Sequence, residues 1–362
     1  MINSNNSCLH AFHLPDYRSI NPYQQLLCDE LATEDVDVSF PAGYRLGLPI
    51  IRSLPIPCPD VLHLHWITRY MHGDTKKEHV FYALRLILDL SLVRLRGIRI
   101  IWTVHNVSAH DASFPAVDTW VRRGIARLVD QIIVHDPVTR EKVSETYGIS
   151  SGKVTVIPHG HYRALYTQDS SNLPDVDVPD PEGRLFLYLG TLRPYKGLTA
   201  LLEAWKTHTK NHPEDHLLVA GKALDDDFGA RLSQAAAAID AVDLHMGYVD
   251  EEKVPSYYAC ADVAVFPFRK ITTSGSLILA MSFGIPVVAP DFESLTWTAG
   301  DASKLFYDHR GPVVPALTDA LRRASTCDLQ ALRDSTERVC DKMGWDTIAK
   351  MTKKVYEEVL AS

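Results

Sequence analysis

Two short segments of the chain carry residue types that can bind a phosphate group. The first runs from Gly190 to Gly197, follows an apolar run and places the cations Arg193 and Lys196 beside a predicted helix start. A helix N-terminus has unsatisfied donors and a partial positive charge, which suits phosphate. Together the segments favour a diphosphate-bearing ligand, with a nucleotide-sugar as the leading candidate. The second segment is a turn of small residues whose backbone N–H groups and hydroxyls suit an anion: Thr273, Ser274, Gly275 and Ser276.

A helix cap is the alternative explanation for the second segment. Ser and Thr begin many helices without any ligand, because their side-chain oxygens accept hydrogen bonds from the first helical turn. We favour anion binding, because the basic segment around Lys196 accompanies this turn in the same half of the chain.

The motifs in this half of the chain occur in an order that resembles the C-terminal domain of a GT-B glycosyltransferase, close to glycosyltransferase family 4. A lone Lys-Gly pair would carry little information, whereas the whole series in this order is specific. The matching residues are, in chain order, Gly190, Lys196-Gly197, Ala220-Gly221, Gly247-Tyr248-Val249, Tyr257-Tyr258, Ala261-Asp262-Val263, Pro267, Ala280-Met281 and Gly284-Ile285-Pro286-Val287-Val288-Ala289.

The resemblance implies a fold, an activity and a donor site. The fold would be α/β, with two Rossmann-like doubly wound domains facing an interdomain cleft. The activity would be that of a hexosyltransferase, which moves a sugar from a UDP- or GDP-linked donor to a carbohydrate or lipid-linked acceptor. Arg193, Lys196 and Gly197 would hold the diphosphate, with the base near Tyr248 and Val249. Because these cations and the helix ends offset the diphosphate charge, we expect no metal and no other cofactor.

One feature departs from the family. Its members usually carry two glutamates around the second turn, one beside the donor sugar and one toward the nucleotide ribose. Ile271 and Leu279 stand at these positions here, so the resemblance supplies neither role. The donor sugar stays open, and the missing carboxylates leave room for an inverting reaction.

Weaker signals lie in the first half of the chain, where two predicted strands end in polar and aromatic residues. His65 and Trp66 follow one strand, and His105 and Asn106 follow the next. Ligands bind beyond the carboxyl ends of strands in doubly wound sheets, so these residues suit a cleft. The resemblance makes His105 the leading contact to the donor sugar, while His65 and Trp66 would line the acceptor side with Asn106. A structural histidine is the alternative for each ring.

Asp16 is the acid best placed to act on an acceptor. It lies in the loop after the first predicted strand, where the family often has a Gly-Gly turn that this chain lacks. An inverting transferase needs a base to take the proton of the acceptor hydroxyl. We therefore name Asp16 as the candidate base, with His105 as its rival. A solvated loop acid is the alternative explanation for Asp16.

Predicted strands alternate with predicted helices in both halves, which indicates two doubly wound α/β domains. In the first half we expect strands at 9–14, 61–65, 98–104, 131–135 and 153–157, and helices at 22–33, 76–95, 115–129 and 137–147. In the second half we expect strands near 184–190, 216–221, 242–246, 262–267, 285–290 and 303–307.

Composition sets the predicted domain boundaries. Residues 167–183 are rich in acids and prolines and have little to bury, so they read as a linker. The acceptor-side domain would then span 1–166 and the nucleotide-sugar domain 184–344. An amphipathic helix is expected over 345–362, and the resemblance implies that it crosses back to the first domain.

Charge and cysteine content exclude several classes of protein. The 362 residues carry a formal net charge of −8, which argues against a nucleic-acid partner. The six cysteines are scattered without a Cys-x-x-Cys pair, so neither a zinc site nor a disulfide framework is expected. The first residues lack the pattern of a signal peptide, and we find no apolar stretch long enough to span a bilayer. We expect a cytoplasmic protein.

The leucine-rich segment from Lys76 to Arg99 has a basic edge. We expect a helix packed on the sheet with its cations in solvent. A peripheral contact with anionic lipid at the inner membrane face is the alternative.

Two other functions remain open beside sugar transfer. One is a sugar epimerase or a glycogen-phosphorylase-like enzyme of the same fold, although the acidic and histidine motifs of the epimerases are not found and phosphorylases need a cofactor lysine in a much longer chain. The other is a catalytically inactive nucleotide-binding module, which the missing glutamates make conceivable. Thermal stabilisation by UDP or GDP tests for nucleotide binding, because a ligand of the native state raises its stability.

Overall fold

The computed structural model describes residues 8–43, 47–71, 73–107, 113–166, 173–271 and 273–362. It divides the chain into two compact units. Unit 1 comprises Met1–Gly160 with Met343–Ser362, and unit 2 comprises His161–Lys342. The division falls at 160 and 342, where the sequence had suggested 166 and 344. Residues 167–172 of the predicted linker lie outside the described residues.

Unit 1 is built on a six-stranded sheet in the order β2-β1-β3-β4-β5-β6, in which every pairing is parallel. The five strands predicted in this half of the chain are confirmed. They could be recognised because a parallel sheet that is covered on both faces needs apolar strands. The edge strand β2 escaped prediction because Asp37 and Ser39 interrupt its apolar pattern. The strands are β1 (Leu9–Leu14), β2 (Val36–Ser39), β3 (Val61–Leu64), β4 (Arg99–Thr103), β5 (Gln131–Val134) and β6 (Val154–Val156).

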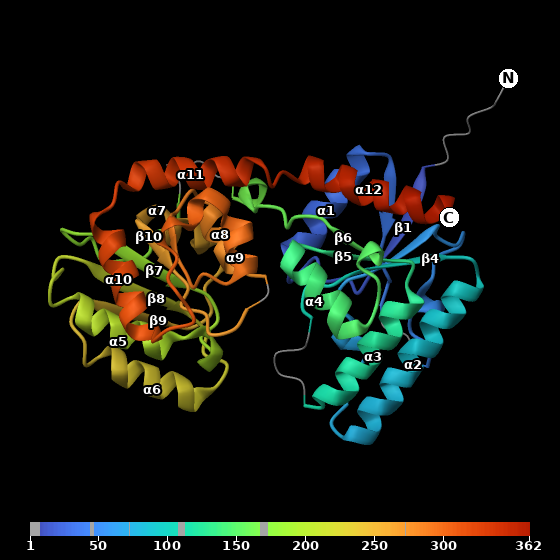
Figure 1. Cartoon of the computed structure of the whole chain (residues 1–362), viewed down its shortest axis with the longest axis horizontal. Coiled ribbons are helices and arrows are strands. Elements are labelled where there is room, and N and C mark those ends of the chain that lie inside the picture. The colour runs from blue at the N-terminus through green and yellow to red at the C-terminus, as the bar shows by residue number, and fades with distance from the viewer. Residues whose placement is uncertain (1–7, 44–46, 72, 108–112, 167–172, 272) are drawn as a thin grey trace. The chain divides into compact units, whose positions relative to one another are not determined.

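Helices cover both faces of this sheet: α2, α3 and α4 lie on one side, and α1 and α12 on the other (Figure 1). Polar caps explain where several begin. Asn21 accepts a hydrogen bond from the Tyr23 N–H at the start of α1, and Thr75 and Glu78 form a capping box at α2. The helices are α1 (Pro22–Thr33), α2 (Lys76–Leu95), α3 (Pro115–Leu128), α4 (Pro137–Tyr147) and α12 (Trp345–Ala361).

Unit 2 contains a five-stranded parallel sheet in the order β11-β10-β7-β8-β9. The strand predicted at 303–307 is wrong, because residues 300–305 close a 3₁₀ turn through local hydrogen bonds. Only Tyr307 pairs with the sheet, in a single bridge to Pro290. The strands are β7 (Leu185–Leu189), β8 (His216–Gly221), β9 (Val242–Met246), β10 (Val263–Val265) and β11 (Val287–Val288).

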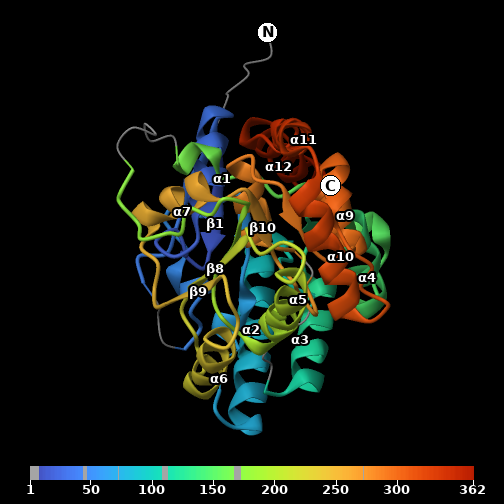
Figure 2. The same ribbon diagram turned by 90° about the vertical axis from the view of Figure 1, so that its left-hand side faces the viewer.

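In unit 2, α5 and α6 lie on one side of the sheet, and α7 and α8 on the other (Figures 1 and 2). The helices are α5 (Leu198–His208), α6 (Asp226–Ala236), α7 (Val254–Cys260), α8 (Gly275–Ser282), α9 (Glu293–Ala299), α10 (Val313–Thr326) and α11 (Leu329–Asp341). Within the described residues, the short 3₁₀ helices are η1 (Ile51–Ser53), η2 (Ile67–Tyr70), η3 (Ser151–Lys153), η4 (Arg163–Leu165), η6 (Pro194–Lys196), η7 (Glu251–Lys253) and η8 (Gly300–Leu305).

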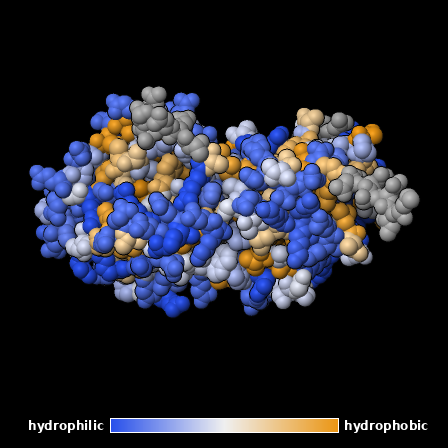
Figure 3. Space-filling view, turned by 90° about the horizontal axis from the view of Figure 1, so that it is seen from above, coloured by the Kyte–Doolittle hydropathy of each residue, from blue (hydrophilic) through white to orange (hydrophobic). Residues whose placement is uncertain are grey.

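Polar residues cover most of one face of the molecule (Figure 3), and α2 carries a row of exposed apolar side chains. On the face drawn in Figure 3, hydrophilic residues predominate and apolar groups are scattered among them, as is normal for a folded protein. Four exposed apolar side chains on α2 are not scattered, because their spacing puts them on one face of the helix. They are Phe81 (62% exposed), Leu84 (52%), Leu88 (53%) and Leu95 (82%).

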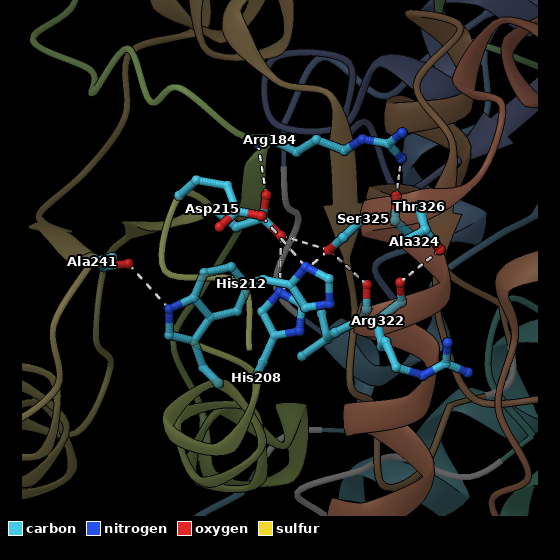
Figure 4. Close-up of polar contacts among 12 residues, drawn as sticks. Arg184, His208, His212, Asp215, Ala241, Arg322, Ala324, Ser325 and Thr326 are labelled. Atoms are coloured by element: carbon cyan, nitrogen blue, oxygen red, sulfur yellow. Dashed lines mark hydrogen bonds and ion pairs between the residues drawn. The ribbon is translucent and has the colours of Figure 1, made fainter. Parts of the chain in front are cut away.

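A buried polar network lies at the amino ends of β7 and β8 (Figure 4). The segments predicted to bind phosphate lie at the opposite end of the sheet. The Asp215 carboxylate accepts hydrogen bonds from His208 Nε2 (2.9 Å) and Ser325 Oγ (2.5 Å). It also accepts one from the Arg184 backbone N–H (2.8 Å). The serine donates to the carboxylate instead of being activated by the imidazole, so this is no hydrolytic triad. The network ties α5 and α10 to the start of β8.

We expect the Asp215→Ala variant to lose about 3 kcal/mol of unfolding free energy, because it leaves buried partners of the carboxylate unpaired. Urea denaturation followed by circular dichroism measures this. Asp243→Ala is the matched control: its carboxylate pairs with His216 but is half exposed, so the loss should stay below about 1 kcal/mol. Equal losses in the two variants would contradict the assignment.

Candidate functional site

The two segments predicted to bind phosphate lie side by side in unit 2. The segment after β7 contains Arg193 and Lys196 and leads into α5, and the segment after β10 leads into α8. The Arg269 N–H donates to the Tyr195 carbonyl oxygen over 3.1 Å and joins them. Gly197 has a φ of 81°, and a Cβ there would lie 1.8 Å from the Pro267 carbonyl oxygen. Only glycine therefore allows the two backbones to approach this closely.

Lys196 is a half-buried cation set among aromatic rings. Its Nζ lies 4.6 Å from the centroid of the Phe268 ring and 5.6 Å from that of Tyr195. Burial, assisted by the charge of Arg193, lowers the pKa of Lys196 to about 8. The side chain therefore stays largely protonated at neutral pH. No carboxylate forms an ion pair with it in the described part of the chain, and a desolvated cation in that state favours an anionic ligand.

The N-terminus of α8 confirms the capping role of Ser274 and leaves further donors in place. Ser274 Oγ accepts a hydrogen bond from the Leu277 N–H over 3.1 Å. The N–H groups of Gly275 and Ser276 belong to the first helical turn, where no intrahelical acceptor exists. Ser276 Oγ is close to Gly190, since a Cβ on that glycine would lie 3.5 Å from it. Capping and anion binding thus use different atoms of one turn, and anion binding stays a prediction.

The other residues predicted to lie on the donor side are at least partly accessible. Tyr248 follows β9 and is 74% exposed, so its ring face is open, while Val249 is half-buried and Thr273 is also partly accessible. An open aromatic face can stack on a nucleotide base. That contact remains a prediction.

In unit 1, six imidazoles gather where the sheet strands end: His13, His63, His65, His105, His135 and His159. His105 is half-buried, and its ring stacks on Trp66 with centroids 4.2 Å apart and an interplanar angle of 11°. The Tyr17 ring also stacks on Trp66, with ring centroids 5.4 Å apart. The predicted residues Trp66 and His105 therefore form one aromatic stack with Tyr17, and contact of this stack with a sugar stays a prediction.

His65 and Asn106 take supporting positions. His65 is 2% exposed, and its two ring nitrogens hydrogen-bond to His105 Nε2 and His13 Nδ1, both at 3.3 Å. The Asn106 backbone carbonyl accepts a hydrogen bond from Arg122 (3.2 Å). Direct contact with a substrate stays a prediction for both residues, and the burial of His65 argues for support of His105 instead.

Burial keeps the histidine rings neutral. Desolvation lowers the pKa of His13 and His159 to about 3 and that of His135 to about 4. Desolvation, together with the neighbouring imidazoles, also holds the pKa of His105 well below its usual range. Neutral imidazoles carry one lone pair each, so they can accept a proton or a hydrogen bond.

Asp16 borders a pocket of about 190 Å³ in unit 1. Pro15, Gly43, Ser53, Arg69 and Tyr70 are among the other residues that line it. Both carboxylate oxygens of Asp16 accept hydrogen bonds from the Arg18 guanidinium at 2.9 Å, and these bonds lower the pKa of Asp16. A carboxylate held in this way is a weaker base. Its catalytic role stays a prediction, with His105 as the rival.

Sequence reasoning missed the residues whose importance depends on packing. Phe268 and Arg269 follow β10 and connect the two segments, and the run of aromatic and basic residues there was the available signal. His13 and His135 were also missed. A histidine near the end of each of several parallel strands could have pointed to them.

Two groups among the described residues have donor atoms close enough to hold a metal: His13, His63 and His65, and Asp291, Asp308 and His309. In the first group, the imidazoles already hydrogen-bond to one another and to Tyr356. In the second, His309 pairs with Asp291 at 2.6 Å. Neither arrangement calls for an ion.

We expect acid to destabilise unit 1. The six histidines of this cluster, five of them buried and His105 half-buried, have a lower pKa in the folded state than their ordinary 6.5. The unfolded state therefore binds more protons below pH 6.5, and stability falls as the pH drops from 6.5 towards 4. Each such group contributes about 1.4 kcal/mol per pH unit. Melting temperatures measured across this range should decline steeply as the pH drops. In His135→Gln, unfolding should take up about one proton fewer, so the decline should be less steep. A flat profile would contradict this.

Two family models match the chain, one in each unit. "Glycosyl transferases group 1" matches residues 183–324, and "Glycosyltransferase Family 4" matches residues 41–161. The chain is 28% identical to a GDP-mannose:glycolipid 4-beta-D-mannosyltransferase of Xanthomonas campestris over 65% of its own length and 62% of that protein. It is 24% identical to a D-inositol 3-phosphate glycosyltransferase of Arthrobacter over 94% of this chain and 90% of that protein. The first match therefore spans less than two thirds of that relative.

Solved structures show the same fold. A glycosyltransferase from Rickettsia africae has a TM-score of 0.66 at 14% identity and covers 98% of this chain and 99% of its own. Sucrose-phosphate synthase from Thermosynechococcus elongatus has a TM-score of 0.64 at 18% identity, with coverage of 97% and 99%. The two Rossmann-like parallel-sheet units show the GT-B fold, and a glycosyltransferase family model matches each of them.

Proposed function

We propose that this protein transfers a hexose from a UDP- or GDP-linked donor to a carbohydrate or lipid-linked acceptor. The observation that carries the proposal is the desolvated Lys196 cation, which packs on Phe268 in the segment that leads into α8, and the Arg269–Tyr195 hydrogen bond that joins this segment to its own. GDP-mannose is the first donor to test, because the Xanthomonas relative carries it in its name. The comparisons favour neither an epimerase nor an inactive module.

The chemical argument concerns the leaving group. Cleavage of the sugar–phosphate bond builds negative charge on the diphosphate, and fixed cations and N–H dipoles stabilise that charge more than the ground state. Lys196, Arg193 and the first turn of α8 supply such groups. We propose that these groups suffice without a metal ion. An inverting transfer would need Asp16 or His105 to take the acceptor proton.

We also propose a peripheral contact between α2 and an anionic lipid surface, which would bring the enzyme to lipid-linked acceptors at the cytoplasmic face. Exposed Phe81, Leu84 and Leu88 form an apolar row, and the exposed cations Lys77 and Arg94 lie on the same helix. A row of this kind inserts its side chains at the lipid boundary while the cations attract anionic headgroups. No helix in the described residues is long and apolar enough to cross a membrane.

We expect Lys196→Ala to reduce the turnover number by a factor on the order of 10²–10³ with the fold unchanged, because a preorganised charge at the leaving group is lost. Release of GDP from GDP-mannose, or of UDP from UDP-sugars, measures the rate, with and without EDTA. Lys206→Ala, in an exposed position of α5, is the matched control and should retain activity. Near-normal turnover of Lys196→Ala would refute the diphosphate assignment.

The lipid contact predicts that the protein co-sediments with vesicles containing anionic phospholipid but not with neutral vesicles. We expect the double variant Phe81→Ser, Leu88→Ser to bind at least about tenfold more weakly, since two apolar side chains no longer insert. Leu224→Ser removes a leucine of similar exposure (50%) from unit 2 and is the control. Equal vesicle binding by all three proteins would exclude α2 as the contact.

A further inference from the structure

A chain of hydrogen bonds runs across the carboxyl edge of the unit 1 sheet. Each neighbouring pair of atoms in it lies between 2.6 and 3.3 Å apart. The chain links segments that are far apart in the sequence, including the C-terminal helix α12. Its members are, in order, Thr103 Oγ1, His63, Tyr356 Oη, His13, His65, His105, His135 and the Ile157 carbonyl oxygen.

The carbonyl end sets the direction of the chain. A carbonyl oxygen only accepts hydrogen bonds, so His135 Nδ1, 3.1 Å from the Ile157 oxygen, carries the hydrogen. His135 is buried and neutral, and therefore its Nε2 carries a lone pair. His105 Nδ1 lies 3.2 Å from that lone pair and must donate to it. The tautomer of His105 then follows: hydrogen on Nδ1, lone pair on Nε2.

The same reasoning extends to the other end without a conflict. The lone pair of His105 Nε2 accepts from His65 Nδ1, and His65 Nε2 accepts from His13 Nδ1. The Tyr356 hydroxyl donates to His13 Nε2 and accepts from His63 Nδ1, and the Thr103 hydroxyl donates to His63 Nε2. Each donor in the chain meets an acceptor, which supports one tautomer for every ring.

We propose that His135, backed by the Ile157 carbonyl, is a positioning residue that holds His105 in the tautomer with an unprotonated Nε2. The inference rests on the proposed function, in which His105 acts on the acceptor or the donor sugar. His135 itself is 3% exposed and touches no substrate. Its effect is exerted through the orientation and tautomer of its neighbour.

The arrangement gives His105 the form that a base needs. In an inverting transfer, the acceptor oxygen forms a bond to the anomeric carbon as the bond from that carbon to the diphosphate breaks. The acceptor proton passes to His105 Nε2, in place of the 3.3 Å hydrogen bond from His65. The resulting cation keeps its Nδ1–H bond to His135, whose own N–H stays on the carbonyl. His135 thus stabilises the charged state, as the partner of a catalytic histidine does.

The test uses two near-isosteric variants of the full-length protein. Gln at position 135 can place an acceptor oxygen near the position of the imidazole Nε2, whereas Met of similar size offers almost none. Long-range ¹H–¹⁵N correlation spectra of the ¹⁵N-histidine-labelled protein report which ring nitrogen carries the hydrogen. The His105 signals are assigned from their loss in His105→Gln, and the metal content of each sample is measured.

In the wild type we expect His105 as the neutral Nδ1–H form at pH 7.5. His135→Gln should retain this form and most of the turnover. His135→Met should shift His105 towards the Nε2–H form and reduce kcat by about 10- to 100-fold with KM for the donor unchanged. A purely structural role for His135 would lower the stability of both variants without moving the tautomer.

The remaining outcomes contradict either the role of His135 or the proposed transferase function, and the two cases can be told apart. His105 found as the Nε2–H form or as a cation in the wild type overturns the inference, and so does a stoichiometric metal bound by His13, His63 and His65. An unchanged tautomer in His135→Met overturns it as well. If the expected spectra appear but no sugar donor is turned over, the tautomer assignment stands and the proposed transferase function fails.

Discussion

Parallel pairing of strands is the constraint on which both candidate sites depend. When neighbouring strands run in one direction, every carboxyl end falls on the same edge of the sheet, and the loops that follow must share that edge. In unit 2 this brings the segment after β7 beside the segment after β10. In unit 1 it gathers histidines from strands β1, β3, β4 and β5. Residues distant in sequence become neighbours without long excursions of the chain.

Close approach at these edges needs small residues at particular positions. Gly197 lets the two loops of unit 2 meet, because a Cβ would collide with the Pro267 carbonyl. Gly160 likewise allows a close approach in unit 1, because a Cβ there would lie 2.3 Å from the Trp345 ring of α12. The C-terminal helix can therefore pack near the histidines, and its Tyr356 joins the hydrogen-bond chain.

Much of the fold and part of the site could be predicted from the sequence. Buried parallel strands have continuous apolar runs, and this identified nearly every strand. Edge strand β2 and the turn at 300–305 were misjudged because composition does not show which backbone groups find partners. The Lys196 and Ser274 segments carried recognisable motifs. The cation–ring contact with Phe268 and the role of the Ile157 carbonyl depend on tertiary packing, and no residue type signals a particular backbone oxygen.

Desolvation acts on both sites with opposite results, because the ordinary pKa of each group differs. Burial lowers the pKa of Lys196 from 10.5 to about 8, which leaves the side chain a cation at neutral pH. Burial lowers the pKa of His135 from 6.5 to about 4, which leaves it without charge. Unit 2 therefore holds a cation, as the proposed diphosphate site requires, and unit 1 holds neutral imidazoles, the form in which a histidine can accept a proton. One physical effect thus prepares the two halves of the proposed reaction.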